Sequence, residues 1–309
     1  MDFNQYVKGN ALEISWTRVN VKELVGFLRS NTYITKLTLK IASINNEDAR
    51  ELAKLTHLTS LDLQNNNIGE KGVEALANGN LVHLAELNLK CNHIRYKSVE
   101  ALANGNLTRL TKLDLRFNEI GDKGAEALAN GNLSRLTELN LSSNDIGEKG
   151  AEALADSNLA RLTSLNLNNN RIGNKGVEAL ANGNLIRLTE LDLMGNNISK
   201  KGAEALANGN LSRLTSLDLR WNRIDDKGVE VYILISLEKR RNREMEESSS
   251  SLSNSGSDSD QSDLSSELSE VQSISSNRLP RFSRSNDSDD SDISRSRADN
   301  SDQLDLRAG

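Results

Sequence analysis

The chain has 309 residues, of which 27% are charged, and its formal net charge is −6 at pH 7. Residues 248–309 hold 12 acidic residues and 6 arginines, so the net charge lies there and the rest of the chain balances at 32 acidic and 32 basic residues. A neutral body lacks the basic surplus that sequence-independent nucleic-acid binding needs, so no nucleic-acid partner is expected. Cys91 is the only cysteine, which excludes an intrachain disulfide and favours a reducing compartment.

The first residues contain no basic stretch followed by an apolar run, and no later apolar run approaches the length of a membrane span. We therefore expect a cytoplasmic protein with no membrane partner. Export into a host cell by a route that reads no N-terminal signal is the alternative. Residues 1–33 are expected to form an N-terminal cap with a degenerate repeat at Leu12, Ile14 and Val19, while Leu24, Phe27 and Leu28 cover the first rung.

The pattern Leu-x-x-Leu-x-Leu-x-x-Asn-x-Ile follows, and it recurs seven times at intervals of 26 residues. The copies begin at Leu58, Leu84, Leu110, Leu136, Leu162, Leu188 and Leu214. A weaker copy lies upstream at Ile34, Leu37, Leu39 and Ile44, so the repeats are expected to occupy residues 34–228. The Leu-x-Leu alternation predicts a short strand whose leucines point inward. The Asn column is predicted to be buried, where its amides satisfy backbone groups of their own and neighbouring turns.

Each unit continues with a helical segment such as Gly69–Gly79, in which Val73, Leu76 and Ala77 share one helix face. We expect Asn78-Gly79 to end this helix in the left-handed conformation. About eight helical residues are too few to be stable alone, so the units must stack into a solenoid.

The repeat pattern stops after residue 228. Residues 229–247 are predicted to be a capping helix, whose Lys239–Arg243 run is either its solvated end or a nuclear-localisation patch. Serine makes up 22 of the 62 residues in 248–309, so this tail cannot bury enough apolar surface to fold and is expected to be disordered.

These units resemble the ribonuclease-inhibitor type of leucine-rich repeat. The Gly-Ala-Glu-Ala-Leu-Ala segments at 124–129, 150–155 and 202–207 are similar to the GALA repeats of bacterial effector proteins. The resemblance implies an α/β solenoid of horseshoe shape, with parallel strands on the concave face and short helices on the convex face. It also implies that partners bind on the concave face or its rim.

Comparison of the seven units shows where a partner could bind, because positions that differ between units are free to specialise. The two residues after the second strand leucine vary most, and alternation points them at the concave face or its rim. The candidates there are Arg116 with Phe117, Met194, and the cluster of Arg220, Trp221 and Arg223. Trp and Arg dominate the energetics of many interfaces. The alternative is that Phe117 and Trp221 fold over the edge of the core.

Two charged columns also repeat. Asp62, Asp114, Asp192 and Asp218 alternate with asparagines along the strands, and this stripe either attracts a basic partner or forms a solvated face. The second column directly precedes the first leucine of each unit and contains His57, His83, Arg109, Arg135, Arg161, Arg187 and Arg213. It either binds phosphate or acidic ligands or pairs with neighbouring acids.

The sequence contains no nucleophile motif and no phosphate-cradling loop, and Cys91 with His93 does not make an ordinary zinc site. We therefore expect neither enzymatic activity nor a metal or cofactor. The predicted function is that of a monomeric protein-interaction scaffold, with a bacterial effector acting on a host protein as its most specific form. The alternatives are a substrate-recognition subunit of a ubiquitin ligase and a GTPase-activating protein of the Ran type.

Overall fold

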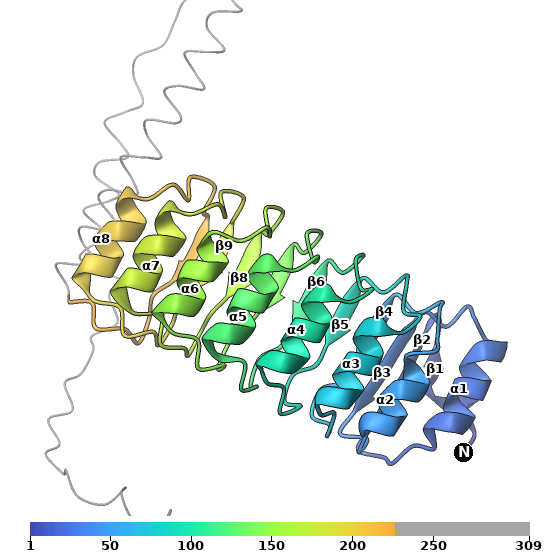
Figure 1. Cartoon of the computed structure of the whole chain (residues 1–309). Helices are drawn as coiled ribbons and strands as arrows, with labels where there is room; N and C mark the ends of the chain where they lie inside the picture. Colours follow the sequence, from blue (N-terminus) through green and yellow to red (C-terminus); the bar gives the residue numbers. More distant parts are fainter. Residues whose placement is uncertain (226–309) are drawn as a thin grey trace, which may run out of the picture. The chain divides into compact units, whose positions relative to one another are not determined.

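The computed structural model describes residues 1–225, which contain one sheet whose ten strands follow one another in chain order. The α-helices lie side by side in a row that covers one face of this sheet (Figure 1). The strands are β1 (Val7–Lys8), β2 (Ala11–Ser15), β3 (Lys36–Lys40), β4 (Ser60–Asp62), β5 (Glu86–Asn88), β6 (Lys112–Asp114), β7 (Glu138–Asn140), β8 (Ser164–Asn166), β9 (Glu190–Asp192) and β10 (Ser216–Asp218). The expected capping helix at 229–247 and the tail at 248–309 lie outside the described residues.

Strands β2 to β10 are parallel and pair in register, so that Leu87 lies between Leu61 and Leu113. The central leucine of each three-residue strand points into the core, as the alternation predicts. The one antiparallel strand, β1, was not predicted; it pairs with β2 through a turn at Gly9, whose φ of 60° suits glycine. The weak upstream copies are confirmed as strands β2 and β3.

The helices are α1 (Val21–Ser30), α2 (Asn46–Leu52), α3 (Glu70–Asn78), α4 (Tyr96–Asn104), α5 (Gly121–Asn130), α6 (Glu148–Ala155), α7 (Gly173–Asn182) and α8 (Lys200–Asn208), and a 3₁₀ turn, η1, spans Phe3–Tyr6. Val73, Leu76 and Ala77 are fully buried on one face of α3, as predicted. At the N-terminal end α1 buries Leu24 and Leu28, and Phe27 packs on the ring of Phe3 at a centroid distance of 5.4 Å. One continuous apolar core therefore runs between the sheet and the helices.

The prediction that Asn78-Gly79 ends its helix in the left-handed conformation is wrong. Gly79 has φ −78° and ψ −164°, which is extended backbone. Glycine is needed because a Cβ at this position would lie 2.6 Å from the carbonyl oxygen of Ala53 in the preceding unit. The same close approach occurs at Gly105, whose Cβ would lie 2.6 Å from the oxygen of Ala77. These glycines therefore serve the packing of one unit on the next.

The left-handed conformation occurs instead just after each parallel strand. This left-handed column consists of Trp16, Ile41, Asn65, Cys91, Phe117, Ser143, Asn169, Gly195 and Trp221, with φ between 52° and 68°. Each unit's backbone turns away from the sheet here while still bonding to the next unit; the N–H of Phe117, for example, donates to the carbonyl of Ser142 at 2.9 Å. The turn therefore fixes the backbone of this column, whatever its side chain.

The residue after the left-handed column is the predicted buried asparagine, and its role is confirmed. The Asn118 amide donates to the carbonyls of Leu89 and Leu115 at 3.1 and 2.8 Å, and its Oδ1 accepts from the N–H groups of Asn92 and Ile94 at 3.0 Å. One side chain thus satisfies backbone groups of two units inside the core.

The asparagines alternate between two bonding patterns along the solenoid. Asn66, Asn118, Asn170 and Asn222 each accept two backbone N–H groups, whereas Asn92 and Asn196 each accept one and the oxygen of Asn144 accepts none within residues 1–225. The cause lies in the preceding unit, where a left-handed residue (Ser43, His93, Asp145 or Asn197) brings the two N–H groups beside it onto one oxygen. The equivalent Glu119 and Arg171 are not left-handed, and their N–H groups bond back to the preceding unit. Structurally, the repeat is therefore a pair of units.

Candidate functional site

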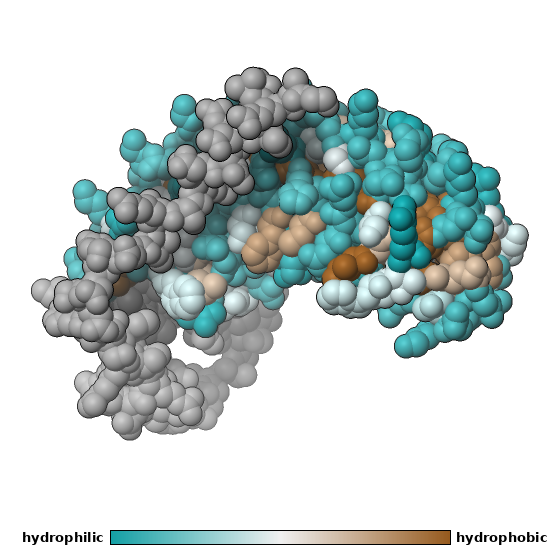
Figure 2. Space-filling model, turned by 90° about the horizontal axis from the view of Figure 1, so that it is seen from below, coloured by the Kyte–Doolittle hydropathy of each residue, from teal (hydrophilic) through white to brown (hydrophobic). Residues whose placement is uncertain are grey.

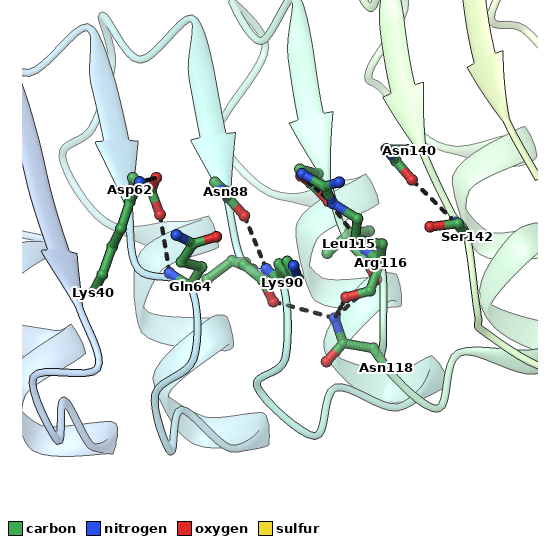
Figure 3. Close-up of polar contacts among 12 residues, drawn as sticks. Lys40, Asp62, Gln64, Asn88, Lys90, Leu115, Arg116, Asn118, Asn140 and Ser142 are labelled. Carbon is green, nitrogen blue, oxygen red and sulfur yellow. Dashed lines mark hydrogen bonds and ion pairs between the residues drawn. The ribbon is translucent and has the colours of Figure 1, made fainter. Parts of the chain in front are cut away.

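The face of the sheet opposite the helices carries two side chains from each short strand, one on either side of the buried leucine. These side chains line a groove of about 450 Å³ that extends over strands β4 to β8. The side chain after the buried leucine is an aspartate or asparagine in every short strand, and these side chains form a row. A neighbouring row comes from the residues two positions later, which include Gln64, Lys90, Arg116 and Ser142 (Figure 3). We call this surface the sheet face.

The row of aspartates and asparagines has a structural role that sequence reasoning missed. Asp62 Oδ1 accepts from the N–H of Gln64 at 3.0 Å, and Asn88 Oδ1 accepts from the N–H of Lys90 at 3.0 Å. The same bond recurs in all seven units. Aspartate and asparagine both supply this oxygen, which explains why only these two types occupy the row. That restriction was visible in the sequence and could have revealed the role.

The aspartates of this row are mostly neutralised within the chain. Asp62 pairs with Lys40 at 3.3 Å, and Asp114 pairs with Arg116 at 2.8 Å. Asp218 is bonded to the guanidinium of Arg220, which lowers the pKa of the Asp218 carboxyl. The interpretation of the row as a negative stripe for a basic partner stays a prediction, and three of its four charges are already paired.

Asp192 differs from the other three, because no cation pairs with it among residues 1–225. Its carboxylate accepts from the Asn166 side chain at 3.0 Å and from the N–H of Met194 at 3.0 Å. Met194 is half-buried beside it. Any attraction for a basic group on this row is therefore concentrated at the end of the sheet near β9.

The structure places Arg116 and Phe117 at the edge of the sheet face where the strands end. Arg116 Nε lies 2.9 Å from Asp114 Oδ2, which holds the guanidinium over its own strand. The Phe117 ring is 52% exposed, and the ammonium of Lys90 lies 5.1 Å from its centroid. The ring is therefore available to a partner and carries a cation beside it.

The second predicted cluster lies at the same edge, after β10. Trp221 is 79% exposed, and Arg220 and Arg223 are exposed beside it. The Arg223 N–H donates to the carbonyl of Ile198 at 2.7 Å, which continues the backbone ladder. Neither Phe117 nor Trp221 is buried, which argues against the alternative that they fold over the edge of the core.

Sequence reasoning missed a third aromatic residue of this edge. Trp16 follows β2 in the same left-handed column, with φ 61°, and it is also 79% exposed. The signal was its position directly after the alternating strand that contains Leu12 and Ile14. Trp16, Phe117 and Trp221 follow β2, β6 and β10, so successive aromatics are four strands apart. We call these three residues the aromatic rim.

The aromatic rim occupies backbone that bulky residues adopt at a cost. A left-handed conformation costs a residue with a Cβ roughly 1–2 kcal/mol, whereas glycine and asparagine adopt it readily. The same column uses Asn65, Asn169 and Gly195 in other units. Burial does not offset the cost at Trp16 and Trp221, because both rings are exposed.

Comparison with known families decides what kind of repeat this is. The family described as leucine rich repeat matches residues 54–77, 80–103, 106–129, 133–155, 161–181, 187–207 and 211–231. The chain is a leucine-rich-repeat protein. Proteins of this family generally act in protein–protein interaction and are typically non-catalytic scaffolds. The match is to the family as a whole, so the ribonuclease-inhibitor and GALA subtypes stay predictions.

Two solved structures are similar to this leucine-rich-repeat protein. An internalin, InlF, from Listeria monocytogenes is 22% identical, with 74% of this chain and 85% of that chain covered and a TM-score of 0.34. The TLR13–ssRNA13 complex is also 22% identical, with a TM-score of 0.47; the match covers 70% of this chain but only 33% of that one. No curated protein matches the sequence. Neither likeness assigns a ligand or partner to this protein.

Two further properties concern the described part of the chain. No helix within residues 1–225 is long and apolar enough to cross a membrane. Within the same residues, no three His, Cys, Asp or Glu side chains are grouped so that they could hold a metal ion. Cys91, a member of the left-handed column, is a partly exposed free thiol.

Proposed function

We propose that this leucine-rich-repeat protein is a non-catalytic scaffold that binds a protein partner across the sheet face, with the aromatic rim as its anchor. The observation that carries the proposal is the placement of Trp16, Phe117 and Trp221. All three are exposed, and all three occupy left-handed backbone, where half of the other units have asparagine or glycine and the rest have isoleucine, cysteine or serine. Strained exposed aromatics that contribute no packing are expected where a partner uses them.

The dimensions of the rim favour a protein over a small ligand. Neighbouring strands are about 4.8 Å apart, so four strands separate successive rim aromatics by roughly 19 Å. A ligand that contacts all three must extend over roughly twice that distance, which is typical of a protein interface. The described surface in Figure 2 is mostly hydrophilic with small apolar patches, as expected for a few anchors within a polar surround.

The predicted candidates fit this proposal as two groups. Phe117 and Trp221 are anchors, and Arg116 and Arg220 are cations already held by Asp114 and Asp218. Because these arginines are preorganised, they would lose little side-chain entropy when a carboxylate or carbonyl of the partner binds. Arg223, Met194 and Asp192 lie near Trp221 at the same end of the sheet, and we assign them to the periphery of the interface.

More specific roles rest on the sequence alone. The effector hypothesis depends on the GALA-like segments, and it stays a prediction. The ubiquitin-ligase and Ran-type alternatives likewise stay predictions, since no contact among residues 1–225 favours either of them.

The test replaces rim tryptophans by asparagine, which the left-handed backbone tolerates. Partners captured by the full chain are identified by mass spectrometry, and the affinity of each is then measured for wild type, Trp16→Asn and Trp221→Asn. We expect at least one tryptophan variant to lose about 2 kcal/mol or more of binding free energy, the threshold for a hot spot. Thermal melting should not be lowered, because neither ring is buried and asparagine adopts the left-handed conformation readily.

The matched controls are Ser143→Asn, in the same column between the aromatics, and Glu178→Ala, on the exposed face of α7. Neither should alter the affinity. A partner that binds both tryptophan variants as tightly as wild type would refute the aromatic rim as its anchor.

A further inference from the structure

A second charged feature lies at the other edge of the sheet. Because β2 to β10 are parallel, their N-terminal ends meet at the edge opposite the aromatic rim. Five arginines stand there, one in each of five successive units, and each directly precedes a leucine that is buried or, at Leu214, partly buried. All five are exposed: Arg109, Arg135, Arg161, Arg187 and Arg213. We call them the arginine ridge.

The arginines of the ridge are not neutralised within the described part of the chain. The expectation that this column pairs with neighbouring acids is not met, because none of the five forms an ion pair with a carboxylate in residues 1–225. Arg109 Nη1 instead lies 3.1 Å from Nδ1 of His83, the residue that precedes it in the column. Other cations of the chain do form ion pairs; Lys112, for example, pairs with Glu138 at 2.7 Å.

The loops that carry the ridge are almost free of acid. They connect each helix to the next strand with the pattern Asn-Gly-Asn-Leu, which in one loop is replaced by Asp-Ser-Asn-Leu at residues 156–159. Five like charges on adjacent units repel one another, and the field they create is positive along the whole edge. Such a row is stabilised when an anionic ligand lies along it. Guanidinium groups suit carboxylate and phosphate oxygens because they can donate two parallel hydrogen bonds.

Two exposed apolar residues narrow the class of ligand. Val82 and Ile186 are 47% and 56% exposed, and they directly precede His83 and Arg187. Apolar side chains at the end of the ridge and within it suit a polypeptide that carries both acidic and apolar residues. A phosphodiester backbone offers no apolar group to them. At the start of the column His57 is partly buried, and this burial lowers its pKa, which disfavours a positive charge at that position.

We propose that the arginine ridge is a second docking edge, which binds an acidic segment of a partner protein. The proposal is independent of the aromatic rim, since the two features lie at opposite ends of the strands. It assigns to this edge a ligand of negative charge.

The experiment uses the full chain and a fluorescein-labelled 20-residue peptide of alternating glutamate and leucine, read by fluorescence anisotropy. The triple variant Arg135→Gln, Arg161→Gln and Arg187→Gln should weaken binding about tenfold or more, because each removes a charge-assisted bond. A triple variant with lysine at these positions should retain part of the affinity, since it keeps the charge but loses the paired donors. Binding by wild type should fall as salt is raised.

The matched control removes the same charge from the helices, with Lys71→Gln, Lys149→Gln and Lys201→Gln, and should change the affinity less than about twofold. Equal losses in both triple variants would mean that the peptide senses only the net charge, which overturns the proposal. So would tighter binding of a 20-nucleotide single-stranded RNA than of the peptide, or no peptide binding by wild type. Circular dichroism of the variants confirms that the fold is retained, because every substituted side chain is exposed.

Discussion

Phe117 and Asn118 are neighbours in the chain and belong to the same turn, yet the two columns they represent behave in opposite ways. The asparagine column is the same residue in all seven units, because its side chain satisfies buried backbone groups of two units. The left-handed column contains Trp, Ile, Asn, Cys, Phe, Ser and Gly, because the turn fixes its backbone and leaves its side chain outside. A position that is constrained only in its backbone can therefore vary in chemistry without disturbing the core.

The largest effect should come from removing the buried amide. Asn118→Ala leaves the N–H groups of Asn92 and Ile94 and the carbonyl of Leu89 without this partner in the core. We expect a loss of roughly 3–5 kcal/mol in the free energy of unfolding, measured by urea titration with circular dichroism. The control is Asn65→Ala in the neighbouring column, which should cost about 1 kcal/mol. Equal losses would remove the distinction between the two columns.

An intermediate effect is expected where one unit approaches another. Gly105→Ala places a Cβ 2.6 Å from the carbonyl oxygen of Ala77, which is backbone and cannot rotate away. We expect a loss of about 1–3 kcal/mol in the free energy of unfolding. Gly105→Asn should be at least as harmful, whereas a left-handed cap would tolerate asparagine. Gly195→Ala, at φ 68° with its nearest neighbouring atom 3.4 Å away, serves as the comparison and should cost about 1 kcal/mol.

The smallest effect should have the opposite sign. Phe117→Asn relieves the left-handed strain and gives up only a half-exposed ring and its contact with Lys90. We expect the free energy of unfolding to rise by about 0.5 kcal/mol, as the net of these terms. The reciprocal change Asn169→Phe should lower it by a similar amount. If thermal melting shows Phe117→Asn to be strongly destabilised, the ring packs on the protein and is no anchor.

Much of the fold could be predicted because its determinants are local and repeat. The leucine alternation, the buried asparagines and the apolar helix face each follow from residue type and spacing. The Asn-Gly prediction failed because glycine serves another purpose here. It leaves room for a carbonyl oxygen of the preceding unit, which a Cβ would contact too closely. That contact depends on how closely units stack, which no single repeat reveals.

The candidate site was predicted less completely. Phe117 and Trp221 were found because their units match the repeat pattern well. Trp16 was missed because the first copies are degenerate: Thr17 and Ala42 stand where later units have asparagine. The charges of the aspartate row were visible, but their pairing with Lys40 and Arg116 depends on side chains of the second row, whose geometry the repeat pattern does not specify.

The alternation of the asparagine bonds has a consequence for how such a chain can change its length. A unit with a left-handed Asp145 or Asn197 presents two converging N–H groups, and the following unit, which is of the other kind, accepts both. Loss of 26 residues would place two units of one kind in contact, a junction that does not occur within residues 1–225. Loss or gain of 52 residues would restore every junction. Lengthening by duplication therefore proceeds most easily in steps of two units, and the surfaces at both sheet edges grow by two positions at a time.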